Sequence, residues 1–443
     1  MASLAVVLII LGCAAIQFLK GTVVRAFATI IVVICAGMIA FGFFEVLANV
    51  FISRGDDSRY TSLVPWAQTL SFLLLFVLSF ALLQTGVTFL TRHPVDLGML
   101  PERIGRVVCG LITGLLASGM VLTAFEMAPL PLSYPYPRFD PAQLDVKRPQ
   151  GVLLKTNSLA TGLFSFLSNS SFSGKRSFAT LHPDFLDQLF LNRLLGTGEV
   201  GIVSSMAPAI EVPKPAVWPA SQAIAEQVDA FVSELRTRGG KVSPDPGGAA
   251  VPLPVSPESG FVPTIVRVGI RKTAIRGASG LSGGAFTPSQ LRVIAKRKGY
   301  GDDPFVGDGI NVYPIGYLAA ADKMQISPLI TVATADFGDG TNAKYIDFVF
   351  CVPNGFEPAL VELKLNSIVE IPRGAIVSAD QAPAPAVFSP SPERKRDSGG
   401  RSGRSSNRSQ QQQQEQQQEA PSARQGGGLS DLSKSVTGVD VDE

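Results

Sequence analysis

Four long apolar stretches before Pro129 constrain this chain more than any other feature of its sequence. They cover residues 4–19, 26–52, 65–91 and 104–128. A helix needs about 20 apolar residues to cross the hydrocarbon core of a bilayer. The last three stretches meet this length, and the first approaches it because its apolar character begins at Ala2. The sequence therefore predicts an all-α bundle of four transmembrane helices over residues 1–130, with the lipid bilayer as its first partner.

The first stretch also resembles two cleavable signals. Its length suits a secretory signal peptide, and Ile10-Leu11-Gly12-Cys13 is similar to the end of a lipoprotein signal. Such signals begin with basic residues, but no charged residue precedes Lys20. We therefore interpret the first stretch as a membrane helix.

The basic residues of the short connections predict an orientation. Cytoplasmic loops are enriched in Lys and Arg. The first connection contains Lys20 and Arg25, and the second contains Arg54 and Arg59. The basic residues of the third are Arg92, Arg103 and Arg106. We expect the first and third connections in the cytoplasm, which places both termini and everything after Pro129 on the outer side.

Small residues recur every four positions in the fourth stretch, at Gly110, Gly114 and Ser118. Such a stripe lets helix backbones approach closely in lipid. Ala36 and Ala40 form a shorter stripe in the second stretch. We interpret both stripes as packing surfaces within the bundle, and the alternative is a seam between copies in a homo-oligomer.

Acidic residues inside lipid are costly and often functional. Glu45 lies toward the outer end of the second stretch, and Glu126 lies at the outer end of the fourth. A transport path would usually place acids near the middle of the membrane. Glu45 is therefore a candidate intramembrane polar site, with a role at the interface or against a neighbouring helix favoured over a water-filled path.

Neither a cofactor nor a metal ion is expected from the sequence spacing. Cys13, Cys35 and Cys109 lie in apolar stretches, where cysteine is commonly a packing residue, and Cys351 stands alone. The two histidines, at positions 93 and 182, form no Cys/His group with metal-ligand spacing. The net charge of +2 gives no general attraction to nucleic acid.

After the membrane half, the sequence predicts a mixed α/β region over residues 131–242. It opens with a proline-rich exit, since proline disfavours helix. Residues 183–195 and 222–236 have helical periodicity, the latter with Ser221 as N-cap and Gly239-Gly240 as stop. Residues 243–260 are rich in Pro, Gly and Ser and are interpreted as a linker.

Period-two alternation then predicts strands at residues 265–270 and 345–352, with further strands at 329–335 and 359–369. These predict a small all-β, sandwich-like domain over residues 261–378. Residues 379–443 contain a basic stretch and a Gln tract and are too polar to fold alone, so we expect a disordered tail. Its arginines are candidates to contact anionic envelope polymers or lipid head groups.

Two runs of residues resemble the colicin V production protein (CvpA) family. They are Gln17-Phe18-Leu19-Lys20-Gly21-Thr22-Val23-Val24-Arg25-Ala26-Phe27 and Leu100-Pro101-Glu102-Arg103-Ile104-Gly105-Arg106-Val107-Val108-Cys109-Gly110-Leu111-Ile112-Thr113-Gly114-Leu115-Leu116. The first resembles the turn of that family's first helical hairpin, and the second resembles the entry to its fourth helix. The resemblance covers residues 1–130. It implies a bacterial inner-membrane protein linked to toxin export and envelope homeostasis, and it brings no catalytic residues.

Some members of that family are fused to a trypsin-like protease. Gly280-Leu281-Ser282-Gly283-Gly284 fits the string around such a nucleophile, and His182 precedes it in the chain. The segment between them, however, is interpreted as helix and proline-rich linker and not as the barrel that such an enzyme needs. Asp397-Ser398-Gly399-Gly400 repeats the string in the tail.

We therefore expect a non-enzymatic, multi-pass protein of the bacterial plasma membrane with an extracytoplasmic domain that binds or spaces an envelope partner. The first alternative is a transport or secretion accessory whose bundle lines a path, and the second is the membrane-anchored serine protease.

Overall fold

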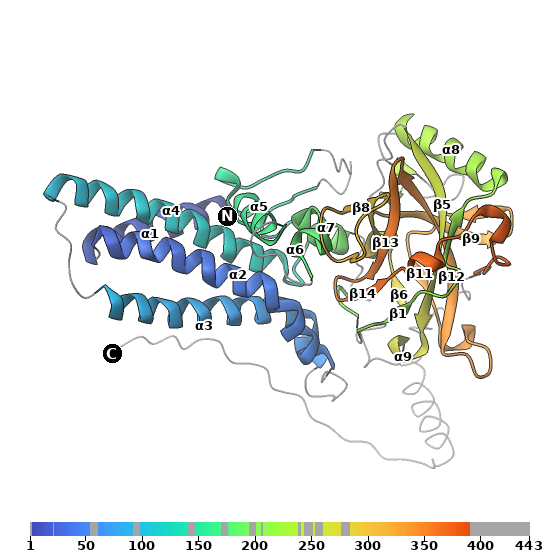
Figure 1. The fold of residues 1–443 in the computed structure, drawn as a ribbon, viewed down its shortest axis with the longest axis horizontal. Helices are drawn as coiled ribbons and strands as arrows, with labels where there is room; N and C mark the ends of the chain where they lie inside the picture. The colour runs from blue at the N-terminus through green and yellow to red at the C-terminus, as the bar shows by residue number, and fades with distance from the viewer. Residues whose placement is uncertain are drawn as a thin grey trace, which may run out of the picture. The chain divides into compact units, whose positions relative to one another are not determined.

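The structure is a computed structural model (Figure 1). It describes residues 2–20, 22–53, 61–91, 98–139, 148–169, 176–194, 201–204, 207–237, 241–242, 251–252, 260–275 and 284–389. Most of the tail predicted from residue 379 lies outside these ranges. Up to residue 389 the chain still packs, because Phe388 is buried in the β core. The folded domain therefore extends past residue 378.

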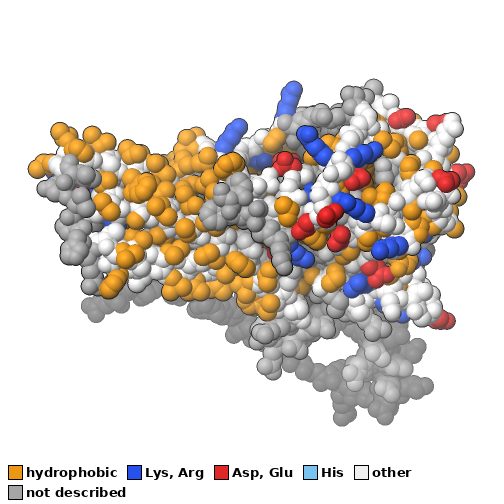
Figure 2. Space-filling model, in the orientation of Figure 1, with side chains coloured by type: hydrophobic (Ala, Val, Ile, Leu, Met, Phe, Trp, Pro, Cys, Tyr) orange, Lys and Arg blue, Asp and Glu red, His pale blue; other side chains and the backbone are white. Residues whose placement is uncertain are grey.

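Each of the four apolar stretches forms one helix. They are α1 (Ala2–Lys20), α2 (Val23–Ser53), α3 (Ala67–Leu90) and α4 (Met99–Glu126). All four are long and apolar enough to cross a membrane. Apolar side chains cover their visible surface, whereas charged side chains gather over the rest of the molecule (Figure 2).

Glycines of α4 bring it against the backbone of α1. A Cβ atom added at Gly110 would lie 2.7 Å from the Cα of Ala14, and one added at Gly114 would lie 2.6 Å from the Cα of Ile10. Ser118, the third member of the stripe, is buried. The small-residue stripe thus lies against a helix of the same chain, and its register makes α1 and α4 antiparallel.

Four further helices follow: α5 (Thr156–Asn169), α6 (Phe178–Leu181), α7 (Phe185–Leu194) and α8 (Gln222–Thr237). The helices predicted at 183–195 and 222–236 are confirmed as α7 and α8. The hydroxyl of Ser221 accepts a hydrogen bond from the backbone N–H of Ile224 at 3.4 Å, as its predicted N-cap role requires. A short helix, α9 (Lys272–Ile275), follows β5.

The larger of two antiparallel sheets has the order β1-β5-β12-β9-β10, with β2 also paired to β5. Its strands are β1 (Ile210–Glu211), β2 (Val217–Pro219), β5 (Phe261–Arg271), β9 (Pro314–Ala320), β10 (Lys323–Gln325) and β12 (Ala343–Pro353). The pairing of β5 with β12 runs without a break from Arg271 opposite Ala343 to Phe261 opposite Pro353. Strands from before residue 243 therefore belong to the same sheet as those after residue 260.

The smaller sheet has the order β14-β13-β7-β8. Its strands are β7 (Leu291–Arg297), β8 (Ile310–Val312), β13 (Phe356–Leu363) and β14 (Ser367–Glu370). Two short pairs complete the described strands: β3 (Lys241–Val242) with β4 (Val251–Pro252), and β6 (Ala285–Phe286) with β11 (Ile330–Thr331).

The two main sheets share one apolar core, and each has a second covered face. Val266, Phe348, Val293 and Val361 are among the side chains that meet in the core. Helix α8 packs its apolar face on the far side of the larger sheet. The far side of the smaller sheet contacts the α6 region through Leu181. The sandwich-like core predicted from alternation is thus present, with helices on both outer faces.

Two strand predictions need correction. The segment 359–369 was expected to be one strand, but it forms the hairpin β13–β14, because Lys364 and Leu365 adopt positive φ values of 54° and 61° and reverse the chain. The strand expected at 329–335 shrinks to β11. Strands β7 and β9 were not predicted. Successive residues of both strands are buried, so their sequences lack the clear alternation of apolar and polar residues by which the other strands were recognised.

The packing of α1 on α4 gives a test. We expect Gly114→Ala to lower the free energy of unfolding by about 1–3 kcal/mol, because the added methyl group meets backbone that cannot move aside. Gly86→Ala in α3 is the control, since nothing lies within 4 Å of a Cβ there; it should stabilise by up to about 1 kcal/mol through helix propensity. Equal thermal unfolding midpoints of the two variants in detergent would contradict this packing.

Candidate functional site

The junction between the membrane helices and the β domain is held by a cluster of aromatic rings. The ring of Phe41 on α2 lies 5.0 Å from that of Phe72 on α3 and 4.8 Å from those of Phe164 on α5 and Phe178 on α6. Phe185 on α7 is 6.2 Å away. One apolar core therefore spans the bundle and the helices that connect it to the sheets.

The β13–β14 turn enters the same core. The side chain of Leu365 is buried among the aromatic rings, and its carbonyl accepts a hydrogen bond of 3.2 Å from the amide of Gln68 on α3. Burial lowers the pKa of the neighbouring Lys364 to about 7. A strand hairpin of the β domain is thus anchored on α3.

His182 stands at the edge of this core. It ends α6, where its backbone N–H bonds to the carbonyl of Phe178 at 2.8 Å, and Pro183 follows. The imidazole is 2 % exposed, and its ring lies 5.1 Å from Phe178 and 5.0 Å from Phe185. The histidine that the sequence analysis considered only for a protease-like set is therefore a buried polar group at the junction.

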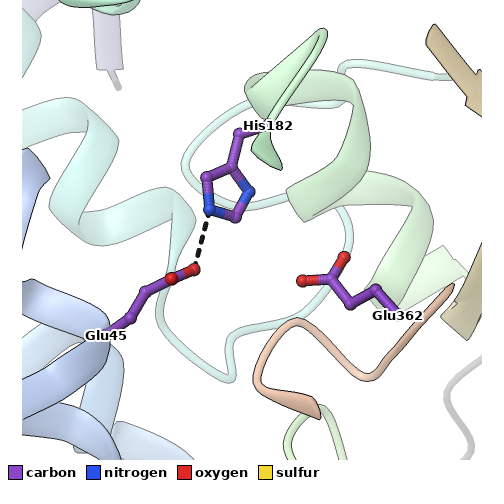
Figure 3. A group of neighbouring side chains, drawn as sticks. All are labelled: Glu45, His182 and Glu362. Atoms are coloured by element: carbon purple, nitrogen blue, oxygen red, sulfur yellow. Dashed lines mark ion pairs between the residues drawn. The ribbon is translucent and has the colours of Figure 1, made fainter. Parts of the chain in front are cut away.

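A chain of polar contacts runs from α2 to the smaller sheet through this histidine (Figure 3). Its Nε2 lies 2.7 Å from Oε1 of Glu45, and its Nδ1 lies 3.0 Å from Oε1 of Gln188. The amide of Gln188 donates to Oε2 of Glu362 at 2.7 Å. Arg292 on β7 forms an ion pair with the same carboxylate. The five residues come from α2, the end of α6, α7, β13 and β7.

Alternation along the strands explains why charged groups are buried here. Successive side chains of a strand point to opposite faces of its sheet. On β7, Val293 and Ala295 enter the core between the sheets, so Arg292 faces the helices. Arg292 also donates to the carbonyl of Leu181 at 2.6 Å and to Asn311. Its hydrogen bonds offset the cost of removing it from water.

A pocket of about 560 Å³ opens beside this chain of contacts. Its apolar wall includes Phe41, Phe43, Phe164 and Phe178. Its polar groups are Glu45, Asn49, Ser168, Arg176 and His182. Phe43 and Val46 line the pocket and are 59 % and 63 % exposed on α2, so the cavity is continuous with the outer face of that helix.

A second polar network caps the end of α4. Asn157 donates to Glu126 at 2.6 Å and to the hydroxyl of Tyr136 at 2.7 Å. Arg193 on α7 donates to the carbonyls of Ala128, Leu130 and Tyr134 at 3.3–3.4 Å. Burial lowers the pKa of Arg193 to about 10. The carbonyls that Arg193 binds belong to the segment that follows α4, so this network fixes the exit of the chain from the bundle.

The residues singled out from the sequence fall in three places. Glu45 and His182 come together at the junction, whereas Gly110, Gly114 and Ser118 pack inside the bundle. Ser282 and the second protease-like string lie outside the described residues. From the sequence we missed Gln188, Arg292 and Glu362, because no local motif marks Gln188 or Arg292. The one available signal was the carboxylate of Glu362 in an apolar strand, and the strand was predicted there without considering that residue.

Comparison of the chain with protein-family models, with curated proteins and with solved structures gives no match. The resemblance to the colicin V production family therefore stays a prediction.

The buried ion pair gives a test of the junction. We expect Arg292→Met to lower the free energy of unfolding by about 3–5 kcal/mol, because it leaves Glu362 charged and buried without its partner. The control is Arg271→Met, whose partner Glu211 is part-exposed; about 0–1 kcal/mol is expected there. Thermal unfolding in detergent measures both changes, and a small loss for Arg292→Met would contradict the assigned role.

Proposed function

We propose that this chain is a non-enzymatic, multi-pass membrane protein that binds a bilayer phospholipid in the pocket between α2 and the α5–α6 region. The observation that carries the proposal is the composition and position of the pocket. An aromatic wall suits an acyl chain, and the polar groups at Glu45, Asn49, Ser168 and Arg176 suit a head group. Because Phe43 and Val46 are exposed beside the pocket, a lipid reaches it from the side of the bundle.

Helix α5 supports a location at the membrane surface. Its inner face buries Ala160 and Phe164 against the bundle, while Leu159 and Phe166 are exposed on the other side. Leu153 and Leu154, just before the helix, are exposed as well. Exposed apolar side chains on a short amphipathic helix are typical of a helix that lies in the interface between lipid and water.

The orientation follows from the two ends of the bundle. Gln68 and Ser3 contact the soluble part, so one end of the bundle faces it. Arg25, Arg103 and Arg106 belong to the opposite end. Because basic residues favour the cytoplasm, we infer an extracytoplasmic domain. Because of the resemblance over residues 1–130, we also propose that the protein lies in a bacterial plasma membrane and acts in envelope homeostasis or toxin export. For the same reason we propose that it contacts an envelope partner.

Filling the pocket tests lipid binding. A Cβ added at Gly42 meets nothing within 4 Å, and Gly42 lines the pocket. We expect Gly42→Leu to fold normally but to lose most crosslinking by a photoactivatable phospholipid at peptides of α2 and α5, because the leucine occupies the acyl-chain space. Gly86→Leu, also on an open helix surface, should crosslink like the wild type. Equal labelling of both variants would refute the lipid site.

Reporter fusions test the orientation. We expect alkaline phosphatase to be active when fused after Arg138 and after Pro372, because this enzyme folds only outside the cytoplasm. A cytoplasmic reporter at the same two points should be silent. The opposite pattern would place the β domain in the cytoplasm and remove the proposed envelope role.

A further inference from the structure

The geometry of the junction points to a divalent metal site formed by Glu45, His182 and Glu362, a site that ties α2 to strand β13. One ligand atom of each residue lies within 4.8 Å of the other two. The three side chains come from elements far apart in the sequence and converge on one point (Figure 3). Glu45 and His182 also line the pocket, but a metal ion between the three side chains does not require a bound lipid.

The hydrogen bonds of Gln188 determine the form of the histidine. Its amide nitrogen donates to Glu362, so its amide oxygen is the atom that faces Nδ1 of His182. That oxygen accepts a hydrogen bond, so Nδ1 carries a proton. In the neutral imidazole the other nitrogen, Nε2, is then an acceptor with a free lone pair. The nearest atom of the Glu45 carboxylate, Oε1, lies 2.7 Å from Nε2.

Two acceptors that face each other need a positive group between them. Nε2 lies 2.7 Å from Oε1 of Glu45, yet among the described residues neither atom has a partner with hydrogen-bond geometry. Each of the two atoms therefore has a lone pair without a donor, although the atoms lie close together. A metal ion bound by both would satisfy the two lone pairs at once.

Glu362 supplies the independent observation. Its side chain is 1 % exposed, and its Oε1 has no hydrogen-bond partner among the described residues. Its other oxygen is held by Gln188 and Arg292. A buried carboxylate oxygen without a partner is costly, and this one belongs to the group whose ligand atoms converge. The third ligand is thus fixed in place by its neighbours.

The surroundings match those of metal-binding histidines. Such a histidine usually donates its second ring N–H to an oxygen that orients the ring, which is the role of Gln188 here. One imidazole with carboxylates suits a first-row transition ion such as Zn²⁺. Ligand atoms about 2.0–2.2 Å from one ion lie at most about 4.4 Å apart, so small side-chain rotations complete the site.

Zinc binding by the full-length protein in detergent tests the proposal, with Zn²⁺ itself as the probe. After equilibrium dialysis we expect one Zn²⁺ per chain and a higher thermal midpoint with the ion than with a chelator. A change that only disturbs the orientation of a ligand costs about 10–100-fold in affinity. We therefore expect His182→Gln, Glu362→Gln and Glu45→Gln each to weaken binding by about 100-fold.

The other histidine of the chain provides the matched control. His93→Gln should bind zinc like the wild type. If the core variants fail to fold, Glu45→Gln carries the test, because Glu45 is part-exposed on a helix. No zinc on the wild-type protein, or equal binding by Glu45→Gln and His93→Gln, would overturn the site and leave a simple ion pair.

Discussion

The aromatic cluster around Phe41 is the interaction on which the rest of the structure depends. Rings from α2, α3, α5, α6 and α7 meet there, so the apolar core does not end where the bundle ends. The cluster buries its rings away from water, which is favourable. It therefore joins the four-helix bundle to the β domain and places Glu45 beside His182.

Burial of charge on the outer face of the smaller sheet follows from that arrangement. A sheet face covered by helices would ordinarily be apolar, yet Arg292 and Glu362 occupy it. Replacing such a pair with apolar groups often stabilises a protein, so the pair is poorly explained by stability alone. Its effect on geometry is clearer: Arg292 and Gln188 hold one oxygen of Glu362 in place and leave the other without a hydrogen bond among the described residues.

The elements predictable from the sequence are those with one-sided or continuous apolar patterns. The four N-terminal helices were recognised from their apolar composition. The periodicity of apolar residues identified α7, α8, β5 and β12. Strand β7 was not, because both its faces are covered and Arg292 interrupts the apolar face. The site could not be predicted as a unit, because Glu45, His182 and Glu362 are brought together by tertiary packing over more than 300 positions of sequence. Glu45 alone was identifiable, since a carboxylate in an apolar helix is rare.

The insertion of Leu365 has a mechanical consequence. The tip of the hairpin packs among the aromatic rings, and its carbonyl accepts a hydrogen bond from Gln68. The smaller sheet is therefore attached directly to α3. A displacement of the β13–β14 hairpin therefore acts directly on α3, because a packed side chain and a hydrogen bond, and not a flexible linker, connect the two.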